Sequence, residues 1–282
     1  VKKISSHITK KVADKLEELY KNSRKDFEKK WDDIRVFIRY GMITTEPFAE
    51  RADKFALLKD TEGKYFTLEE YKEKIKDTQT DKDKKLVILY TTDKEEQHTY
   101  ISAAQTKGYS VLELDSVIDI HYIDFLERKN EKVAFKRVDA ELTDKLINKN
   151  VDNIVSKLNE DESKKVEELF KGAVPADVQI FVQVEAAAED AAPVSLMQPE
   201  FMRRMSDMSQ LGGMDYMSGM GRSYTLLVNA NHPVVTGLID TADEEKNNNV
   251  VSQLIDLALL SQGLLKGEKL SMFINRSIDI IK

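Results

Sequence analysis

The most constraining feature of the sequence is a strand–helix–strand pattern over residues 86–114. An apolar, β-rich run at 86–90 precedes a helical pattern at 94–107, Gly108 interrupts that pattern, and a second strand-like run follows at 109–114. Two strands joined by one helix at this spacing pair in parallel through a right-handed crossover. A helix at 117–128 and a strand at 132–138 would complete a small parallel α/β unit.

Helical patterns occupy the chain before this unit. One helix is expected from residue 4 to about 40, ending at Gly41 in a left-handed conformation. Further helices are expected at 47–58 and at 67–76. Thr67 and Glu70 have the spacing of a capping box at the start of the last of these. We therefore expect helices over residues 1–77 and the α/β unit over 84–138.

The second half of the sequence mixes strands and helices. Strands are expected at 177–184 and 192–196, paired with each other, and at 224–228. Two helices follow, one announced by Thr241 and Glu244 and ending at Gly263, and one carrying Leu270 to Ile281.

The charged stretch at 139–165 predicts a helix or a helix with a linker, and it places a domain boundary near 139–143. The expected domains are residues 1–140 and 141–282. The predicted fold class is α/β and α+β. A helical segment and a small parallel α/β subdomain precede a mixed α+β domain that ends in two helices.

Charge and composition exclude several classes of function. The net charge is −7, and residues 141–282 carry 14 Lys and Arg against 22 Asp and Glu. The first thirty residues are basic, but their lysines occupy the polar face of an amphipathic helix, so we expect no nucleic-acid partner. No apolar run approaches the roughly 20 residues that a membrane span needs. The chain has no Cys, which suits a reducing compartment, and we expect a cytoplasmic location.

The usual motifs of catalysis and metal binding are missing. The four His residues are scattered, and no glycine-rich phosphate loop follows a strand. Asp93 and Asp115 end predicted strands, where active groups can lie, but helix N-caps use the same residue at the same place. We therefore expect no catalytic residue, no cofactor and no metal in this chain, which we do not expect to be an enzyme.

The last two helices carry more apolar surface than one partner can cover. The penultimate helix has one apolar stripe that can pack on the sheet of its own domain, and Leu257 and Leu260 extend its apolar surface over more than one face. The simplest further partner is a second copy of the chain, which would form a four-helix interface. The alternative is that both helices lie wholly inside one subunit. The predicted dimerisation residues are Leu254, Leu257, Ala258, Leu260, Leu270, Phe273, Ile274, Ile278 and Ile281.

Seven of the nine methionines lie between residues 197 and 220. Pro199 opens a helical pattern there, and a glycine-rich stretch at 211–221 follows it, which we expect to be mobile. Met adapts to varied apolar surfaces, so this segment predicts binding to many unlike partners. The alternative is a short helix docked on its own domain. The candidate binding residues here are Phe201, Met202, Met205, Met208, Leu211, Met214 and Met217.

Several segments in this order resemble the ninety-kilodalton heat-shock chaperones in their bacterial HtpG form. The opening Ile4 to Leu16 is similar to the start of the helical part of that family's middle domain, and so is Trp31 preceding 37–42. The segment 202–205 resembles the family's Met-containing amphipathic helix, and 257–263 resembles its dimerisation helix. The likeness extends over essentially the whole chain.

This resemblance implies a stress-response chaperone that dimerises and binds unfolded or partly folded client proteins. Residues 1–140 would be the C-terminal portion of the middle domain, and 141–282 the dimerisation and client-binding domain. Trp31 matches a family position that faces the cleft between subunits, so it joins the candidate client-binding residues, although its helical spacing equally suits a core. ATP and Mg belong to parts of the full-length family outside this chain, which we expect to be inactive as an ATPase. The alternative function is a stand-alone dimeric scaffold with one specific folded partner.

Overall fold

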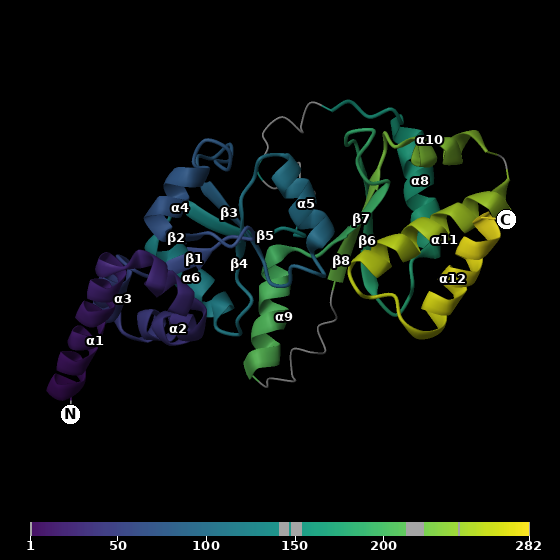
Figure 1. The fold of residues 1–282 in the computed structure, drawn as a ribbon. Helices are drawn as coiled ribbons and strands as arrows, with labels where there is room; N and C mark the ends of the chain where they lie inside the picture. Colours follow the sequence, from purple (N-terminus) through teal and green to yellow (C-terminus); the bar gives the residue numbers. More distant parts are fainter. Residues whose placement is uncertain (1, 141–146, 148–153, 213–222, 242, 282) are drawn as a thin grey trace. The chain divides into compact units, whose positions relative to one another are not determined.

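A computed structural model describes residues 2–140, 147, 154–212, 223–241 and 243–281 (Figure 1). The chain divides into two compact units, Val1–Val138 and Asp139–Lys282. Both units combine helices with small sheets, two in unit 1 and one in unit 2 among the described residues, which confirms the predicted mixed α/β and α+β class.

Unit 1 begins with α1 (Lys2–Asn22), α2 (Arg24–Thr44) and α3 (Glu46–Ala52). The prediction was wrong in expecting a single helix and in ending it at Gly41. The helix is interrupted at Ser23, whose backbone is not helical (φ −152°, ψ 83°) and whose hydroxyl donates to Asp26 at 2.8 Å. Gly41 lies inside α2, and a Cβ on it would be 2.9 Å from the ring of Phe48 on α3. Glycine at this position therefore allows α2 and α3 to approach each other closely.

A short antiparallel hairpin follows α3. It pairs β1 (Leu57–Lys59) with β2 (Tyr65–Thr67), so the expected helix at 47–58 ends early and gives way to a strand. The next helix, α4 (Leu68–Ile75), begins as predicted. The Thr67 side chain accepts from the Glu70 N–H, and the Glu70 carboxylate accepts from the Thr67 N–H.

The parallel sheet predicted for unit 1 is confirmed. Its strand order is β4-β3-β5, with β3 (Leu86–Thr91) central and both β4 (Val111–Glu113) and β5 (Val133–Arg137) parallel to it. The crossovers are α5 (His98–Thr106) and α6 (Asp119–Lys129). Gly108, with φ of +77°, follows α5 in a conformation that suits glycine.

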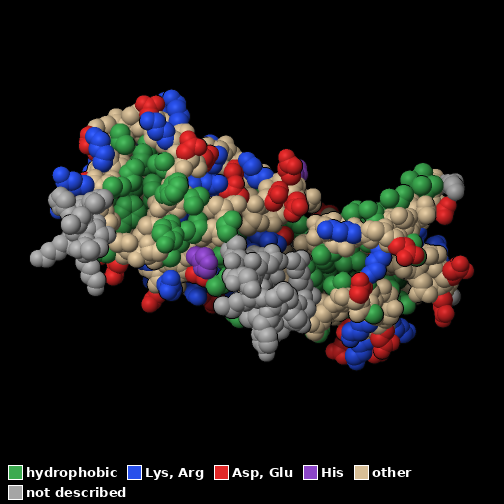
Figure 2. Space-filling model, turned by 90° about the horizontal axis from the view of Figure 1, so that it is seen from below, with side chains coloured by type: hydrophobic (Ala, Val, Ile, Leu, Met, Phe, Trp, Pro, Cys, Tyr) green, Lys and Arg blue, Asp and Glu red, His purple; other side chains and the backbone are tan. Residues whose placement is uncertain are grey.

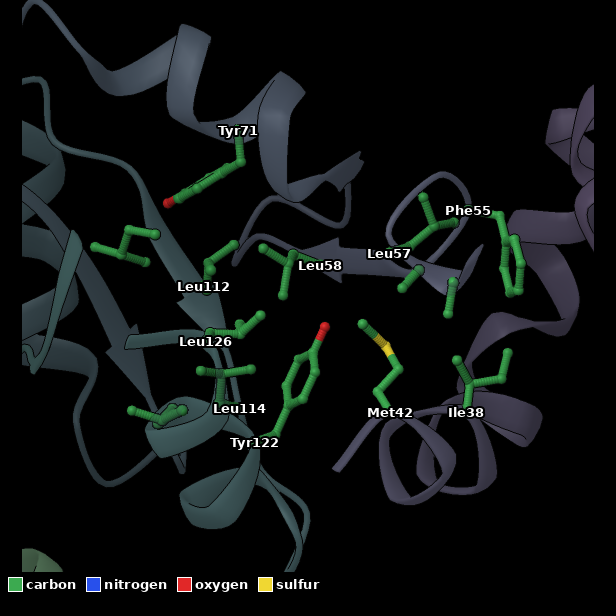
Figure 3. Packing of buried hydrophobic residues seen from close by; sticks show 14 of the residues in the cluster. Ile38, Met42, Phe55, Leu57, Leu58, Tyr71, Leu112, Leu114, Tyr122 and Leu126 are labelled. Atoms are coloured by element: carbon green, nitrogen blue, oxygen red, sulfur yellow. The ribbon is translucent and has the colours of Figure 1, made fainter. Parts of the chain in front are cut away.

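The core of unit 1 joins its helices to its sheets. Figure 3 shows side chains from α2, β1, β4 and α6, and Leu114 directly after β4, converging on one another. Those from the four elements include Ile38, Met42, Leu57, Leu58, Leu112, Tyr122 and Leu126. All of these are buried. The helical segment and the α/β subdomain of unit 1 therefore share one hydrophobic core.

Unit 2 contains a second three-stranded sheet. Its order is β6 (Gln179–Glu185), β8 (Ser223–Asn229), β7 (Val194–Met197), with β6 parallel and β7 antiparallel to β8. The predicted pairing of the first two strands was wrong, because β8 lies between them. Strand order is set by packing against the surrounding helices, which local sequence does not report.

Four helices accompany this sheet in the described part of unit 2, besides the methionine-containing helix α9 (Glu200–Gly212). They are α8 (Glu160–Ala173), α10 (Pro233–Asp240), α11 (Glu244–Ser261) and α12 (Gly267–Ile281). Helix α8 begins at a capping box of Asn159 and Glu162, beyond most of the charged stretch expected to be helical. Helix α10 was not predicted, and it moves the N-cap of α11 from Thr241 to Asp243.

Candidate functional site

The two C-terminal helices pair within unit 2 and divide the predicted dimerisation residues into two groups. Helix α11 faces its own core with residues spaced three and four apart, namely Val251, Leu254, Ile255, Ala258 and Leu259. Leu254 and Ala258 are therefore core residues, which corrects their predicted place at a dimer contact. Leu270 and Phe273 of α12 are half-buried and pack against the same cluster.

Polar side chains hold α12 against α11. Arg276 forms an ion pair with Asp256, and its Nε donates to Gln253 Oε1 at 2.8 Å. Gln253 Nε2 in turn donates to Ser277 Oγ at 2.8 Å. Figure 1 shows the two helices side by side at the C-terminal end of the chain. This network fixes which side of α12 is turned away from α11.

The remaining predicted dimerisation residues are exposed in the single chain. They are Leu257 and Leu260 on α11, and Ile274, Ile278 and Ile281 on α12, here named the C-terminal apolar surface. The spacing along each helix is three or four residues, so each set forms one stripe. Met272 is also exposed but lies on a different side of α12, about 160° around the helix from Ile274. Figure 2 shows that hydrophobic side chains also reach the surface of both units on the face it presents.

Helix α9 presents the described part of the methionine segment. Phe201 is 69% and Met208 41% exposed, whereas Met202 and Met205 are half-buried. Spacings of four and three place Phe201, Met205 and Met208 along one side. The side chain of Leu211, and all of Met214 and Met217, lie outside the described residues, as does the glycine-rich stretch at 213–221.

Charged residues that the sequence reading did not single out stabilise the start of α9. Glu200 forms ion pairs with Arg203 and with Arg204, the second at 2.8 Å. Burial raises the pKa of the Glu200 carboxyl, but the two guanidinium groups lower it by more, so its pKa lies below the ordinary glutamate value. A carboxylate at this position also interacts favourably with the helix dipole. The i, i+3 and i, i+4 spacing of Glu200 from the two arginines is the sequence pattern that could have indicated these ion pairs.

Trp31 is not on a surface. Its side chain is fully buried in the core of unit 1, with its ring centroid 5.8 Å from that of Phe27. The core alternative for this residue is confirmed, and its predicted contact with clients is corrected. The opposite side of α2 instead exposes Val36, Phe37 and Tyr40, which a helical wheel drawn around Trp31 would have indicated.

The described residues contain no group of three or more His, Cys, Asp or Glu side chains arranged to hold a metal ion. Among the helices described, none combines the length and apolar character needed to cross a membrane. The remaining functional candidates are the exposed apolar side chains of α9 and the C-terminal apolar surface.

Comparison with known proteins identifies the family to which the chain is similar. The family model described as Hsp90 protein matches residues 1–280. Chaperone protein HtpG of Bacteroides thetaiotaomicron is 37% identical, over all of this chain and 51% of the relative. Chaperone protein HtpG of Porphyromonas gingivalis is also 37% identical, over 98% of this chain and 50% of the relative. The chain thus spans about half the length of the curated relatives it matches.

Proposed function

Because the chain belongs to the Hsp90 family, we propose that it is the client-binding and dimerising part of a molecular chaperone. Unit 1 would be the end of the middle domain and unit 2 the C-terminal domain. The observation that carries the proposal is the exposed side of α9, where Phe201 and Met208 contribute nothing to a core yet lie beside half-buried methionines.

The chemistry of α9 suits weak and varied binding. Fully burying one such side chain is worth roughly 1.5–3 kcal/mol. A few partly buried contacts, reduced by the cost of ordering the partner, give the modest affinity from which a client can be released. Met adapts its shape to unlike apolar partners, which favours breadth over selectivity.

Dimerisation would multiply this weak contact. We propose that the C-terminal apolar surface packs on its twin in a second copy and forms an interface of four helices. Two α9 helices would then act on one client, and the second contact would benefit from a high effective concentration.

We further propose that the chain itself neither binds nor hydrolyses ATP, and that the protein acts in the cytoplasm. The sequence lacks a glycine-rich phosphate loop, and its lack of Cys suits a reducing compartment. A turnover measurement with ATP and Mg checks the first point, and measurable phosphate release by the purified chain would contradict it.

Client binding is tested by replacing the two exposed side chains of α9 with polar ones. We expect Phe201→Gln with Met208→Gln to weaken binding of a permanently unfolded protein, such as reduced and carboxymethylated lactalbumin, by about tenfold. Fluorescence polarisation with a labelled client provides the dissociation constant. Helical circular dichroism should stay unchanged, because neither side chain is buried.

Phe181→Gln is the matched control. Phe181 is an exposed aromatic residue of the same unit, but it lies on β6 rather than α9. Its replacement should leave client binding unaltered. Equal weakening in both variants would assign binding to general surface hydrophobicity, and a chain that captured only one native protein would support the scaffold alternative.

A further inference from the structure

Unit 1 carries an open groove that shares no residue with either proposed surface. The groove has a volume of about 690 Å³ and lies between the C-terminal part of α4, the start of β3 and the turn from α6 to β5. Six of its lining residues are Lys or Arg and three are Glu, in a chain whose net charge is −7. The cations are Lys72, Lys76, Lys84, Arg128, Lys129 and Lys132.

Half of these cations already have an acidic partner. Lys72 pairs with Glu69 at 2.8 Å, Lys76 with Glu73, and Lys129 with Asp53. The first two pairs have the i,i+3 spacing that is common along helix surfaces, and the third joins the end of α6 to the residue after α3.

The other three cations form no ion pair with any residue in the described ranges. They are Lys84, Arg128 and Lys132, and all three are exposed. Arg128 Nε donates to the Asp124 carbonyl at 3.2 Å, which orients its guanidinium group. Lys84 has a φ of +62°, a conformation that glycine adopts at lower cost.

Two apolar side chains accompany these cations. Leu86 and Val133 are partners in the β3–β5 ladder, and both line the groove. Val133 is buried and Leu86 half-buried, so they offer a small apolar contact among positive charges. The combination fits a ligand that carries an apolar group between anionic ones.

We propose that this groove binds an acidic peptide segment of a partner protein, with one apolar side chain between its carboxylates. Glu69, Glu73 and Glu131 interrupt the positive charges of the groove, which suits separately spaced anionic groups better than the unbroken phosphate row of a nucleic acid. None of the described lining residues is aromatic, so bases would find no stacking platform. The carboxylates of a peptide can instead be spaced to meet Lys84, Arg128 and Lys132. This proposal does not depend on the client-binding or dimer proposals.

The test uses the whole chain and a fluorescein-labelled, glutamate-rich peptide with a central leucine, followed by fluorescence polarisation at low salt. Reversing two of the unpaired cations, Lys84→Glu with Lys132→Glu, should weaken peptide binding about tenfold. The matched control is Lys25→Glu with Lys30→Glu on α2, which changes the net charge equally at exposed positions outside the groove. We expect the control to bind the peptide as the unaltered chain does.

Three results would overturn the proposal. The first is no measurable binding of the peptide by the unaltered chain. The second is an equal loss in the groove variant and the α2 variant, which would show attraction by overall charge alone. The third is a single-stranded oligonucleotide of similar charge that displaces the peptide and binds more tightly, which would make the groove a nucleic-acid site.

Discussion

At the residue scale, a buried ion pair between Arg39 and Asp119 joins α2 to α6. Arg39 is 1% exposed, and its guanidinium lies over the ring of Tyr122, 5.2 Å from the centroid. Asp119 also accepts from the Ser116 N–H at 3.0 Å. Burying two charges is costly, but removing one of them leaves the other unpaired inside the protein. Each charge of the pair therefore depends on the other remaining in place.

We expect Asp119→Asn to destabilise the chain by about 3–5 kcal/mol, because Arg39 would remain buried without a counter-charge. Asn keeps the size of the side chain, so the loss reports charge rather than packing. Urea unfolding followed by circular dichroism measures the change in the free energy of unfolding.

Asp115→Asn, four residues before Asp119 in the chain, provides the comparison. Asp115 pairs with Arg35 at 2.6 Å, but its side chain is 46% exposed. Partial burial raises the pKa of the Asp115 carboxyl, while Arg35 lowers it by more, and the net pKa is below the ordinary aspartate value. Exposed pairs are worth about 0–1 kcal/mol. A loss as large as that of Asp119→Asn would contradict the role given to burial.

At the scale of elements, the approach of α2 to α3 depends on a glycine inside a helix. Glycine costs about 1 kcal/mol relative to alanine in a helix interior. Gly41 nevertheless leaves room for the ring of Phe48, which is itself buried and 6.5 Å from the ring of Phe55 between centroids. Packing between the helices outweighs the local preference of one of them.

Gly41→Ala should therefore destabilise the chain by about 1–3 kcal/mol, since the added methyl group would displace a buried ring. In a Phe48→Leu background the same substitution should cost less or become favourable, because alanine is then free to improve the helix. A double-mutant cycle in urea measures this coupling. The same cost in both backgrounds would show that the ring does not set the requirement.

At the scale of the whole molecule, the C-terminal apolar surface is exposed in the single chain. Five Leu and Ile side chains of α11 and α12 are exposed there, although residues beside them on the same helices are buried in the core of unit 2. Pairing this surface with its twin would bury apolar area at no cost to the fold of either copy.

Charge placed on this surface should prevent association. We expect Leu257→Glu with Ile278→Glu to sediment as a monomer at micromolar concentration, and the unaltered chain to sediment as a dimer. Both side chains are exposed in the single chain, so the variant should keep its circular dichroism spectrum. An unaltered chain that sediments as a monomer would remove the dimer proposal.

Met272→Glu with Val155→Glu controls for added charge. Both residues belong to unit 2 and are exposed, but neither is part of the C-terminal apolar surface. The control should remain a dimer. Dissociation of both variants would instead indicate that overall charge, rather than this surface, governs association.

The sequence by itself determined the features that depend on residues close to one another along the chain. It predicted the capping box of Thr67 and Glu70, the parallel β3–β4 pair, the turn at Gly108 and the apolar stripe of α12, because each arises from spacing within one or two elements. It also carried enough family likeness to indicate a chaperone.

Only the tertiary structure decided which apolar residues are available for binding. Trp31, Leu254 and Ala258 have the same helical spacing as exposed residues, but they lie in a core, whereas Phe201, Leu257 and Ile278 do not. Strand β8 lies between β6 and β7, although it follows both in the sequence. Gly41 lies against Phe48, which belongs to the next helix. Neither arrangement can be read from the spacing of residues within one element. Periodicity shows that a residue has an apolar side to bury, and only packing shows whether its own chain has already covered it.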